Sequence, residues 1–242
     1  MLVPLYEAAY DRLEVGTGTR LLGLGCGSGL ALLVAASRGA SVVGVEDDEE
    51  LLSLAGERLR PDPVGGTPHW DGRLLRGRPD EPVRFSRTAR TPNVVTAFHA
   101  RPYAGALADT TAALERGTPV VLAGWGPAER CAAASALRVA ARLADPASTH
   151  WAPGGRDDLE ELALRSGLRL DGSGRVACPF GYADMASAVR GLLSTGLYDA
   201  AVRETDEQQV LKELTEALHP YQRSGGTVWM PNLFRYVIAR TV

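Results

Sequence analysis

Four glycines stand at every second position of the segment LLGLGCGSGL, which covers residues 21–30. Glycine inside a strand or helix is destabilising by about 0.5–1 kcal/mol relative to alanine, so the cluster requires a reason. A glycine-rich turn between a strand and a helix brings backbone N–H groups toward a ligand, near the positive end of the helix dipole. A Cβ atom at Gly25 or Gly27 would occupy the space of that ligand. The cluster therefore predicts a binding site built from backbone.

Glu46 ends a second apolar run, SVVGVE, and its carboxylate can accept two hydrogen bonds from a ribose diol. The two features together predict a nucleoside-containing cofactor. The dinucleotide fingerprint G-x-G-x-x-G/A fails in every frame, because Ser28, Leu30 and Leu32 stand where its last small residue is required. The G-x-x-x-x-G-K-[ST] motif is also missing, since the region has no lysine. Phosphate binding is therefore disfavoured.

The glycine cluster lies within a longer alternation of predicted strands and helices. Apolar runs bounded by glycine, proline or polar residues predict strands, and helical spacing of apolar residues predicts helices. The expected strands are residues 19–25, 41–46, 73–77, 93–98, 119–125, 168–180 and 227–240. The expected helices are residues 5–13, 29–40, 47–60, 103–116, 127–146, 155–167, 183–195 and 206–219, with Ser28 as an N-cap and Gly39 as a helix stop. This order predicts a parallel sheet covered by helices.

LLGLGCGSG followed by VVGVE resembles motif I and the acidic loop of the class I S-adenosylmethionine-dependent methyltransferases. The similarity extends through NVVTAF, PVVLAGWGP and a final strand near FRYVIAR. The resemblance implies a cofactor site for S-adenosylmethionine formed by Gly23, Gly25, Cys26, Gly27, Glu46, Asp47, Asp80, Ala97 and Phe98. Within this set, the backbone of residues 25–27 would line the methionine part and Glu46 would hold the ribose hydroxyls. Asp80 or its neighbour Glu81 would face the adenine amine.

The chain departs from the family pattern at two positions. The family usually has an acid where Gly23 stands, and that acid helps to position the methionine end of the cofactor. It commonly has aspartate where Asn93 precedes the fourth strand, and we expect this change to affect local structure more than chemistry.

Several further side chains are expected near the reaction. His99 follows the fourth strand, and the carboxyl ends of such strands face the ligand crevice, so it is the best candidate for a catalytic base; the alternative is a histidine hydrogen-bonded in a loop. Tyr6 and Tyr10 could close over the substrate pocket or simply pack their helix. Trp125 could form a wall of the acceptor site or be buried in the core. We expect Cys26 to be a small buried residue and not a nucleophile.

The bulk composition restricts the function classes. The 242 residues carry a net charge of −3, which gives no footprint for nucleic acid. The three cysteines are widely spaced and suggest neither a disulfide framework nor a zinc site, and the histidines have no ligand spacing, so we expect no metal site. The absence of a signal peptide pattern and of a long apolar run predicts a cytoplasmic protein that does not bind membranes.

We therefore expect an α/β fold, with a Rossmann-like, mostly parallel seven-stranded sheet, helices on both faces and an inserted helical cap. A single domain, 1–242, would have a cofactor-binding core at 15–125 and cap insertions at 126–150 and 181–226. The expected function is methylation of a small-molecule acceptor, in secondary metabolism, by a monomer or homodimer. Two alternatives stay open: an enzyme of this fold that catalyses a cyclisation or rearrangement, and a non-catalytic binding protein.

Overall fold

The computed structural model describes residues 2–60, 72–84, 91–144, 155 and 157–242. His69 and His150 lie outside these residues. The chain divides into two compact units. The sheet unit consists of Leu2–Gly124, Asp157–Val176 and Arg235–Val242. The helical unit consists of Trp125–Arg156 and Ala177–Phe234.

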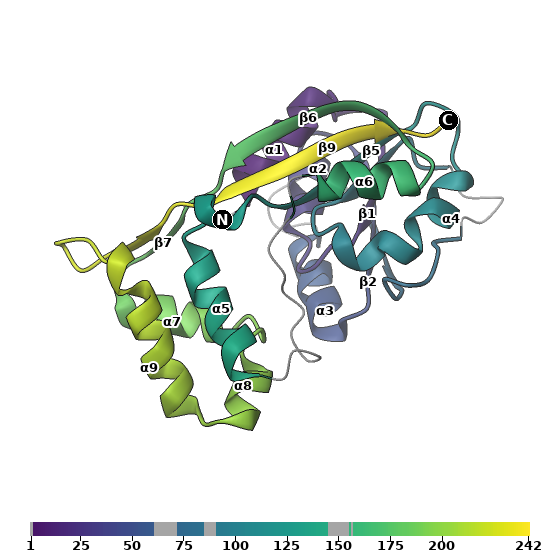
Figure 1. Ribbon diagram of the computed structural model, residues 1–242. Helices are drawn as coiled ribbons and strands as arrows, with labels where there is room; N and C mark the ends of the chain where they lie inside the picture. Colours follow the sequence, from purple (N-terminus) through teal and green to yellow (C-terminus); the bar gives the residue numbers. More distant parts are fainter. Residues whose placement is uncertain (1, 61–71, 85–90, 145–154, 156) are drawn as a thin grey trace. The chain divides into compact units, whose positions relative to one another are not determined.

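A seven-stranded sheet with the order β3-β2-β1-β4-β5-β9-β6 organises the sheet unit (Figure 1). Its strands are β1 Arg20–Leu24, β2 Ser41–Glu46, β3 Gly72–Arg76, β4 Val94–Ala97, β5 Pro119–Trp125, β6 Arg169–Ala177 and β9 Leu233–Arg240. The pairs β1–β2, β2–β3, β1–β4 and β4–β5 are parallel. From β1 the chain builds outward through β2 and β3 and then returns to add β4 on the other side. The carboxyl ends of β1 and β4 therefore form a topological switch point, where ligands bind in open α/β sheets.

The central strands β1, β4 and β5 are buried on both faces, which explains why they are nearly continuous apolar runs. Alternate residues of β1 enter different clusters: Leu21 packs with α1 (Val3–Arg12) and α2 (Leu30–Ser37), whereas Leu22 packs with α4 (Leu107–Ala112) and α6 (Asp158–Arg165). The helix α3 (Glu49–Arg58) follows β2 and begins at the N-cap Asp48, whose carboxylate accepts from two backbone N–H groups. The result is the expected three-layer α/β arrangement.

The helical unit has its own core and a second, two-stranded sheet. Its elements are η2 Ala128–Arg130, α5 Ala133–Leu143, β7 Phe180–Tyr182, α7 Met185–Leu193, α8 Asp199–Glu204, α9 Glu207–Leu218, η4 His219–Tyr221 and β8 Val228–Met230. The strands β7 and β8 are antiparallel. Leu214 of α9, Ala136 of α5 and Tyr198 before α8 are completely buried in one apolar cluster. Asp184 and Asp206 cap α7 and α9 through their side chains.

Several local expectations were wrong. The strand expected at 168–180 is divided into β6 and β7, which belong to different sheets. Ser28 is not the N-cap of α2, because Gly29 takes that position with φ +78° and Ser28 instead receives a hydrogen bond from Arg58. The helix expected at 103–116 is a 3-10 turn, η1 Arg101–Gly105, followed by the short α4. The single final strand is divided into β8 and β9 around Pro231, which has no N–H to donate. The helix α8 was not expected.

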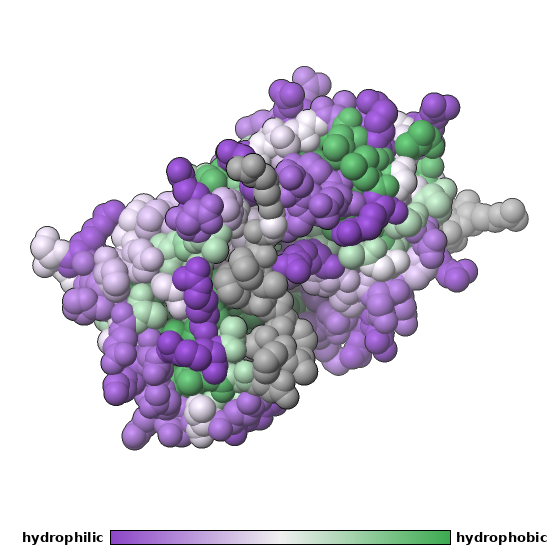
Figure 2. Space-filling view, viewed as in Figure 1, coloured by the Kyte–Doolittle hydropathy of each residue, from purple (hydrophilic) through white to green (hydrophobic). Residues whose placement is uncertain are grey.

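No helix among the described residues is long and apolar enough to cross a membrane. On the face shown in Figure 2, hydrophilic residues predominate and hydrophobic residues lie in small groups among them.

Candidate functional site

The glycine-rich turn after β1 depends on backbone conformations that only glycine adopts easily. Gly25, Gly27 and Gly29 have φ of +64°, +53° and +78°. A side chain at such angles costs about 1–2 kcal/mol, so the turn requires glycine at each position. A Cβ atom at Gly29 would also lie 2.8 Å from the Cβ of Ala55 in α3. The alternating glycines are therefore explained first by the sharp turn from β1 into α2.

Glu46 connects this turn to the end of β2. It is 7% exposed, and its Oε2 accepts a hydrogen bond of 2.8 Å from the backbone N–H of Gly27. Its Oε1 accepts from the backbone N–H of Asp47 at 3.0 Å. An ionised carboxylate has about four acceptor positions, so Glu46 keeps capacity for a further donor such as a ribose hydroxyl. The glycine turn and Glu46, which the sequence analysis singled out separately, are joined by a hydrogen bond in the structure.

The pKa of Glu46 is raised above its ordinary value. Loss of water around the carboxylate is the main cause, and the Asp47 side chain adds to it. The N–H groups of Gly27, Asp48 and Asp47 act in the opposite direction. When ionised, the Glu46 carboxylate accepts from neutral hydroxyl donors and repels an anionic phosphate, in agreement with the missing phosphate motifs.

Tyr103, in η1 after β4, is the residue of this site that the sequence reasoning missed. It is 5% exposed, and a Cβ at Gly25 would lie 2.7 Å from its ring Cε2 and 3.0 Å from its hydroxyl oxygen. Burial raises the pKa of Tyr103, and the charges of Glu46 and Asp47 raise it further. The rule that drew attention to His99, which favours residues just after β4, also covers Tyr103 and could have found it.

The space beside the turn is open at Gly27 and occupied at Gly25. A Cβ at Gly27 would meet no described atom within 4 Å, whereas Gly25 is covered by the Tyr103 ring. The turn and Glu46 fit the nucleoside part of the implied cofactor. A ligand that reaches Gly25 from the side on which its Cβ would project requires the Tyr103 ring to move.

Gly23, where the resembling family keeps an acid, has a packing explanation. It pairs in register with Gly44 of β2. A Cβ at Gly23 would lie 2.9 Å from Cδ2 of Leu32, and a Cβ at Gly44 would lie 2.5 Å from Cδ1 of the same leucine. The two glycines thus make room on one face of the sheet for Leu32, which is 1% exposed. An acid at Gly23 would require this leucine to shift.

Other predicted residues lie at or near the same strand ends. Burial and the charge of Glu46 raise the pKa of the Cys26 thiol to about 12, so this thiol is not a nucleophile at neutral pH. Asn93 binds the start of β1, accepting from the N–H of Arg20 at 2.7 Å, as expected for a local structural role. Asp80 is exposed in the loop after β3 and pairs with Arg78 at 3.1 Å. The neighbouring Glu81 is also exposed.

An aromatic group lies beside the end of β4. The ring of Phe98 is 4.6 Å from that of Tyr6 and 5.7 Å from that of Tyr10, measured between centroids. Tyr10 is completely buried and its hydroxyl donates to the carbonyl of Ala31 at 3.0 Å. Tyr10 therefore presents no surface to a substrate and packs α1 against its neighbours, which is the alternative stated for it above. Ala97 is likewise completely buried, at the last position of β4.

His99 follows β4 by two residues and lies at the surface. Its pKa is lowered, mainly because neighbouring protein atoms displace water from the imidazole and then because of the Arg101 charge. The neutral form is therefore favoured at pH 7, which a proton acceptor requires. Trp125, in the helical unit, packs against Phe234 with 4.5 Å between ring centroids.

Comparison with known proteins identifies the fold. No family model matches this chain, and no curated protein matches it. Solved structures do match: a SAM-dependent methyltransferase from Methanosarcina mazei has a TM-score of 0.58 at 13% identity, with 99% of each chain covered. A SAM-dependent methyltransferase from Thiobacillus denitrificans, in complex with S-adenosyl-L-homocysteine, has a TM-score of 0.54 at 19% identity, covering 97% of this chain and 90% of its own. This chain has the class I methyltransferase fold.

The class I methyltransferase fold does not by itself decide the reaction. The [4+2]-cyclase SpnF has a TM-score of 0.58 at 13% identity, covering 98% of this chain and 80% of its own. Proteins of different activity thus share this arrangement, and function must be argued from the site.

Proposed function

We propose that this protein binds S-adenosylmethionine and transfers its methyl group to a small molecule. The observation that carries the proposal is the bond from the Gly27 N–H to the Glu46 carboxylate, which joins the glycine turn to the end of β2. This junction lies at the carboxyl end of the sheet, beside the switch point between β1 and β4. A glycine turn and a carboxylate in this relation suit a nucleoside whose ribose offers two hydroxyl donors.

Each residue of the site has a proposed role toward that cofactor. The backbone at Gly25 and Gly27 would lie along the methionine and ribose parts, and the remaining acceptor positions of Glu46 would take the ribose hydroxyls. When bound, the cofactor would supply an electrophilic methyl group on a sulfonium. Much of the acceleration of such a displacement can come from alignment of the reactants, which can recover about 7–11 kcal/mol of the barrier. His99, held neutral, would accept the acceptor's proton where one must be lost.

Binding is tested with S-adenosylhomocysteine, the demethylated product, in thermal unfolding experiments. A ligand at about 100 times its Kd adds about 2.7 kcal/mol to the free energy of unfolding. We expect a clear rise in Tm for the wild type and none for Gly27→Ala, because the new Cβ would project into the open space at the turn. If S-adenosylhomocysteine does not raise the Tm of the wild type, the proposal is wrong, and the remaining alternative is a non-catalytic protein that retains the fold.

Gly167→Ala is the matched control for Gly27→Ala. Gly167 has φ +71°, and a Cβ there would also meet no described atom within 4 Å. Both substitutions therefore carry a similar backbone strain, of about 1–2 kcal/mol. The Tm of both variants should fall, but only Gly27→Ala should lose the shift with S-adenosylhomocysteine. Equal shifts in both variants would mean that the cofactor binds elsewhere.

A second candidate function is a cyclisation or rearrangement in which the cofactor pocket is kept without methyl transfer. Leu32 occupies the side of β1 on which the family acid would be expected at Gly23, and a cyclase shares the fold. Incubation with S-adenosylmethionine labelled on its methyl group, together with a library of small acceptors, separates the two candidates. Labelled product supports the methyltransferase, whereas binding of the cofactor without transfer to any acceptor favours the second function.

A further inference from the structure

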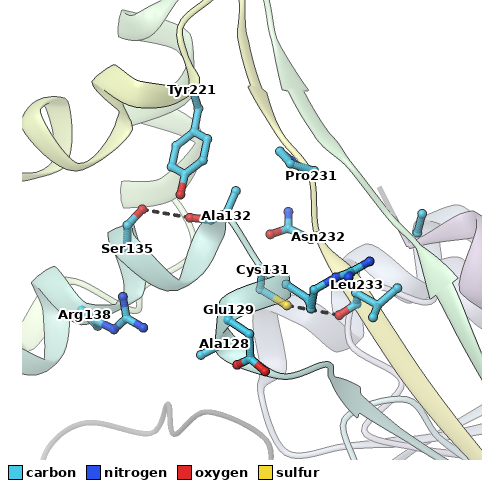
Figure 3. A pocket seen from close by; sticks show the side chains of 12 residues that line it. Ala128, Glu129, Cys131, Ala132, Ser135, Arg138, Tyr221, Pro231, Asn232 and Leu233 are labelled. Carbon is cyan, nitrogen blue, oxygen red and sulfur yellow. Dashed lines mark hydrogen bonds between the residues drawn. The ribbon is translucent and has the colours of Figure 1, made fainter.

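A cavity of about 490 Å³ lies within the helical unit. Its walls come from η2, the start of α5, η4 and the residues that join β8 to β9, as Figure 3 shows. The lining residues are Ala128, Glu129, Arg130, Cys131, Ala132, Ser135, Arg138, Ala177, Tyr221, Pro231, Asn232 and Leu233. Pockets of about 300–1,000 Å³ are typical of small-molecule sites, so this cavity has the size for a ligand.

Part of this lining is buried and fixed by hydrogen bonds. Asn232 is 3% exposed; its Oδ1 accepts from the N–H of Ala133 at 2.9 Å, and its Nδ2 donates to the carbonyl of Met230 at 3.1 Å. The Cys131 thiol donates to the carbonyl of Leu233 at 3.2 Å. Because these bonds join η2 and α5 to the chain between β8 and β9, the cavity is formed before any ligand enters.

Two arginine residues of the lining have no carboxylate partner among the described residues. Neither Arg130 nor Arg138 forms an ion pair with a described residue, although Arg142, one turn further along α5, is paired with Glu213. Among the described residues of the lining, Glu129 is the one acid, so the two arginines give this part of the lining a net positive charge. Guanidinium groups match carboxylates and phosphates in geometry and form strong charge-assisted hydrogen bonds with them.

Hydroxyl groups and apolar side chains complete the lining. Figure 3 shows the Tyr221 hydroxyl pointing toward Ser135 and Ala132. The Ser135 hydroxyl donates to the carbonyl of Ala132 at 2.8 Å, which leaves its oxygen free to accept. The Tyr221 hydroxyl makes no hydrogen bond to a described residue and is available as a donor. Ring and aliphatic surfaces of a ligand can rest against Leu233.

We propose that this cavity binds a small organic oxyanion, either a carboxylate or a phosphate monoester, through Arg130 and Arg138. The charged end of the ligand meets the guanidinium groups of the lining, singly or together, and its ring or chain lies along the apolar lining. The described residues hold no group of three metal-binding side chains, so the cationic lining is not paired with a nearby metal site there. This proposal goes beyond the methyltransferase function and does not depend on it.

The proposal is tested by titrating the full chain with benzoate, phenyl phosphate and the neutral analogue benzamide, using calorimetry and NMR. We expect at least one of the two anions to bind and benzamide to bind at least about tenfold more weakly, because it cannot form the charge-assisted bonds. Binding of benzoate alone identifies a carboxylate site, and binding of phenyl phosphate alone identifies a phosphate site. Equal binding of benzamide, or no binding of either anion at millimolar concentration, would overturn the proposal.

Variants locate the site. Arg130→Gln and Arg138→Gln should each weaken anion binding by about tenfold or more, since each removes one charged donor. Arg203→Gln is the matched control, because Arg203 also lies exposed in the helical unit without an ion pair to a described residue but lines no part of the cavity. All three variants should unfold at nearly the wild-type temperature, which excludes a folding defect. Unchanged affinity in the combined Arg130→Gln and Arg138→Gln variant would refute the assignment.

Discussion

Glu46 has two tasks at the level of single residues. Its carboxylate holds the N–H of Gly27, and so stabilises the turn in the absence of any ligand. The same group is the proposed acceptor for ribose hydroxyls, because ionised carboxyl oxygens can accept more than one hydrogen bond each. The residue is therefore part of the fold as well as part of the proposed site, and its replacement would affect both. For this reason the variant Gly27→Ala, compared with its control Gly167→Ala, tests cofactor binding more clearly than a substitution of Glu46.

His99 provides a prediction that pH can test. Displacement of water and the Arg101 charge lower its pKa, so the neutral imidazole is favoured in the folded protein. An NMR titration of the imidazole protons, with His99→Gln to assign the signal, should give a pKa below the ordinary 6.5. Any activity that needs His99 as a base should fall only when the pH drops through that lowered value.

The same residue predicts a kinetic effect. Loss of a general base costs about 10²–10⁴-fold in rate, so His99→Gln should lower methyl transfer by at least about a hundredfold and leave the thermal shift with S-adenosylhomocysteine intact. His219→Gln, in the helical unit, is the control and should keep the wild-type rate. An unchanged rate of methyl transfer in His99→Gln would mean that His99 has only a structural role in its loop.

At the scale of elements, two buried tyrosines differ in the hydrogen bonding of their hydroxyl groups. The Tyr10 hydroxyl ties α1 to α2 through its bond of 3.0 Å to the carbonyl of Ala31. The Tyr198 hydroxyl, in the core of the helical unit, is buried and has no hydrogen-bond partner among the described residues. Removing a bonded hydroxyl costs about 0.5–1.5 kcal/mol, whereas removing an unpaired buried one relieves a desolvation cost.

We therefore predict opposite results for the two phenylalanine variants. Tyr10→Phe should reduce the free energy of unfolding by about 1 kcal/mol, and Tyr198→Phe should leave it unchanged or raise it. Urea denaturation of both variants beside the wild type measures the difference. A loss in Tyr198→Phe as large as that in Tyr10→Phe would contradict the unpaired state of its hydroxyl.

The elements also show how far the sequence could be interpreted. The bounds of β2 and β5 agree with those predicted, because each is a buried apolar run with clear signals at its ends. The last strand was misjudged, since alternation continues through Pro231 although the chain leaves one sheet and enters another there. The Asn232 side chain stabilises this break through bonds to the nearby Met230 carbonyl and the distant Ala133 N–H, and nothing in the local pattern reveals the second of these bonds.

At the scale of the whole molecule, the sequence predicted a mostly parallel sheet covered by helices, but not which side chains pack into the site. Alternating strands and helices lead to a sheet with a switch point, and Glu46 and the glycines follow from that topology. Tyr103 became part of the site through its contact with Gly25, which is far from it in the chain. Contacts of this kind depend on tertiary packing, so periodicity and motif spacing could not supply them.

The Tyr103 ring and a bound ligand cannot both occupy the space beside Gly25 into which a Cβ would project. Either the ring covers Gly25 or a ligand does, and the observed affinity equals the intrinsic one multiplied by the fraction of molecules with the ring displaced. Tyr103→Ala should therefore bind S-adenosylhomocysteine more tightly than the wild type, whereas Tyr103→Phe, which keeps the ring, should not gain in this way. Calorimetric titration of the three proteins measures the difference, and weaker binding by Tyr103→Ala would show that the ring assists the ligand. With the expected result, the population of one tyrosine rotamer sets how much cofactor the protein needs for half-saturation.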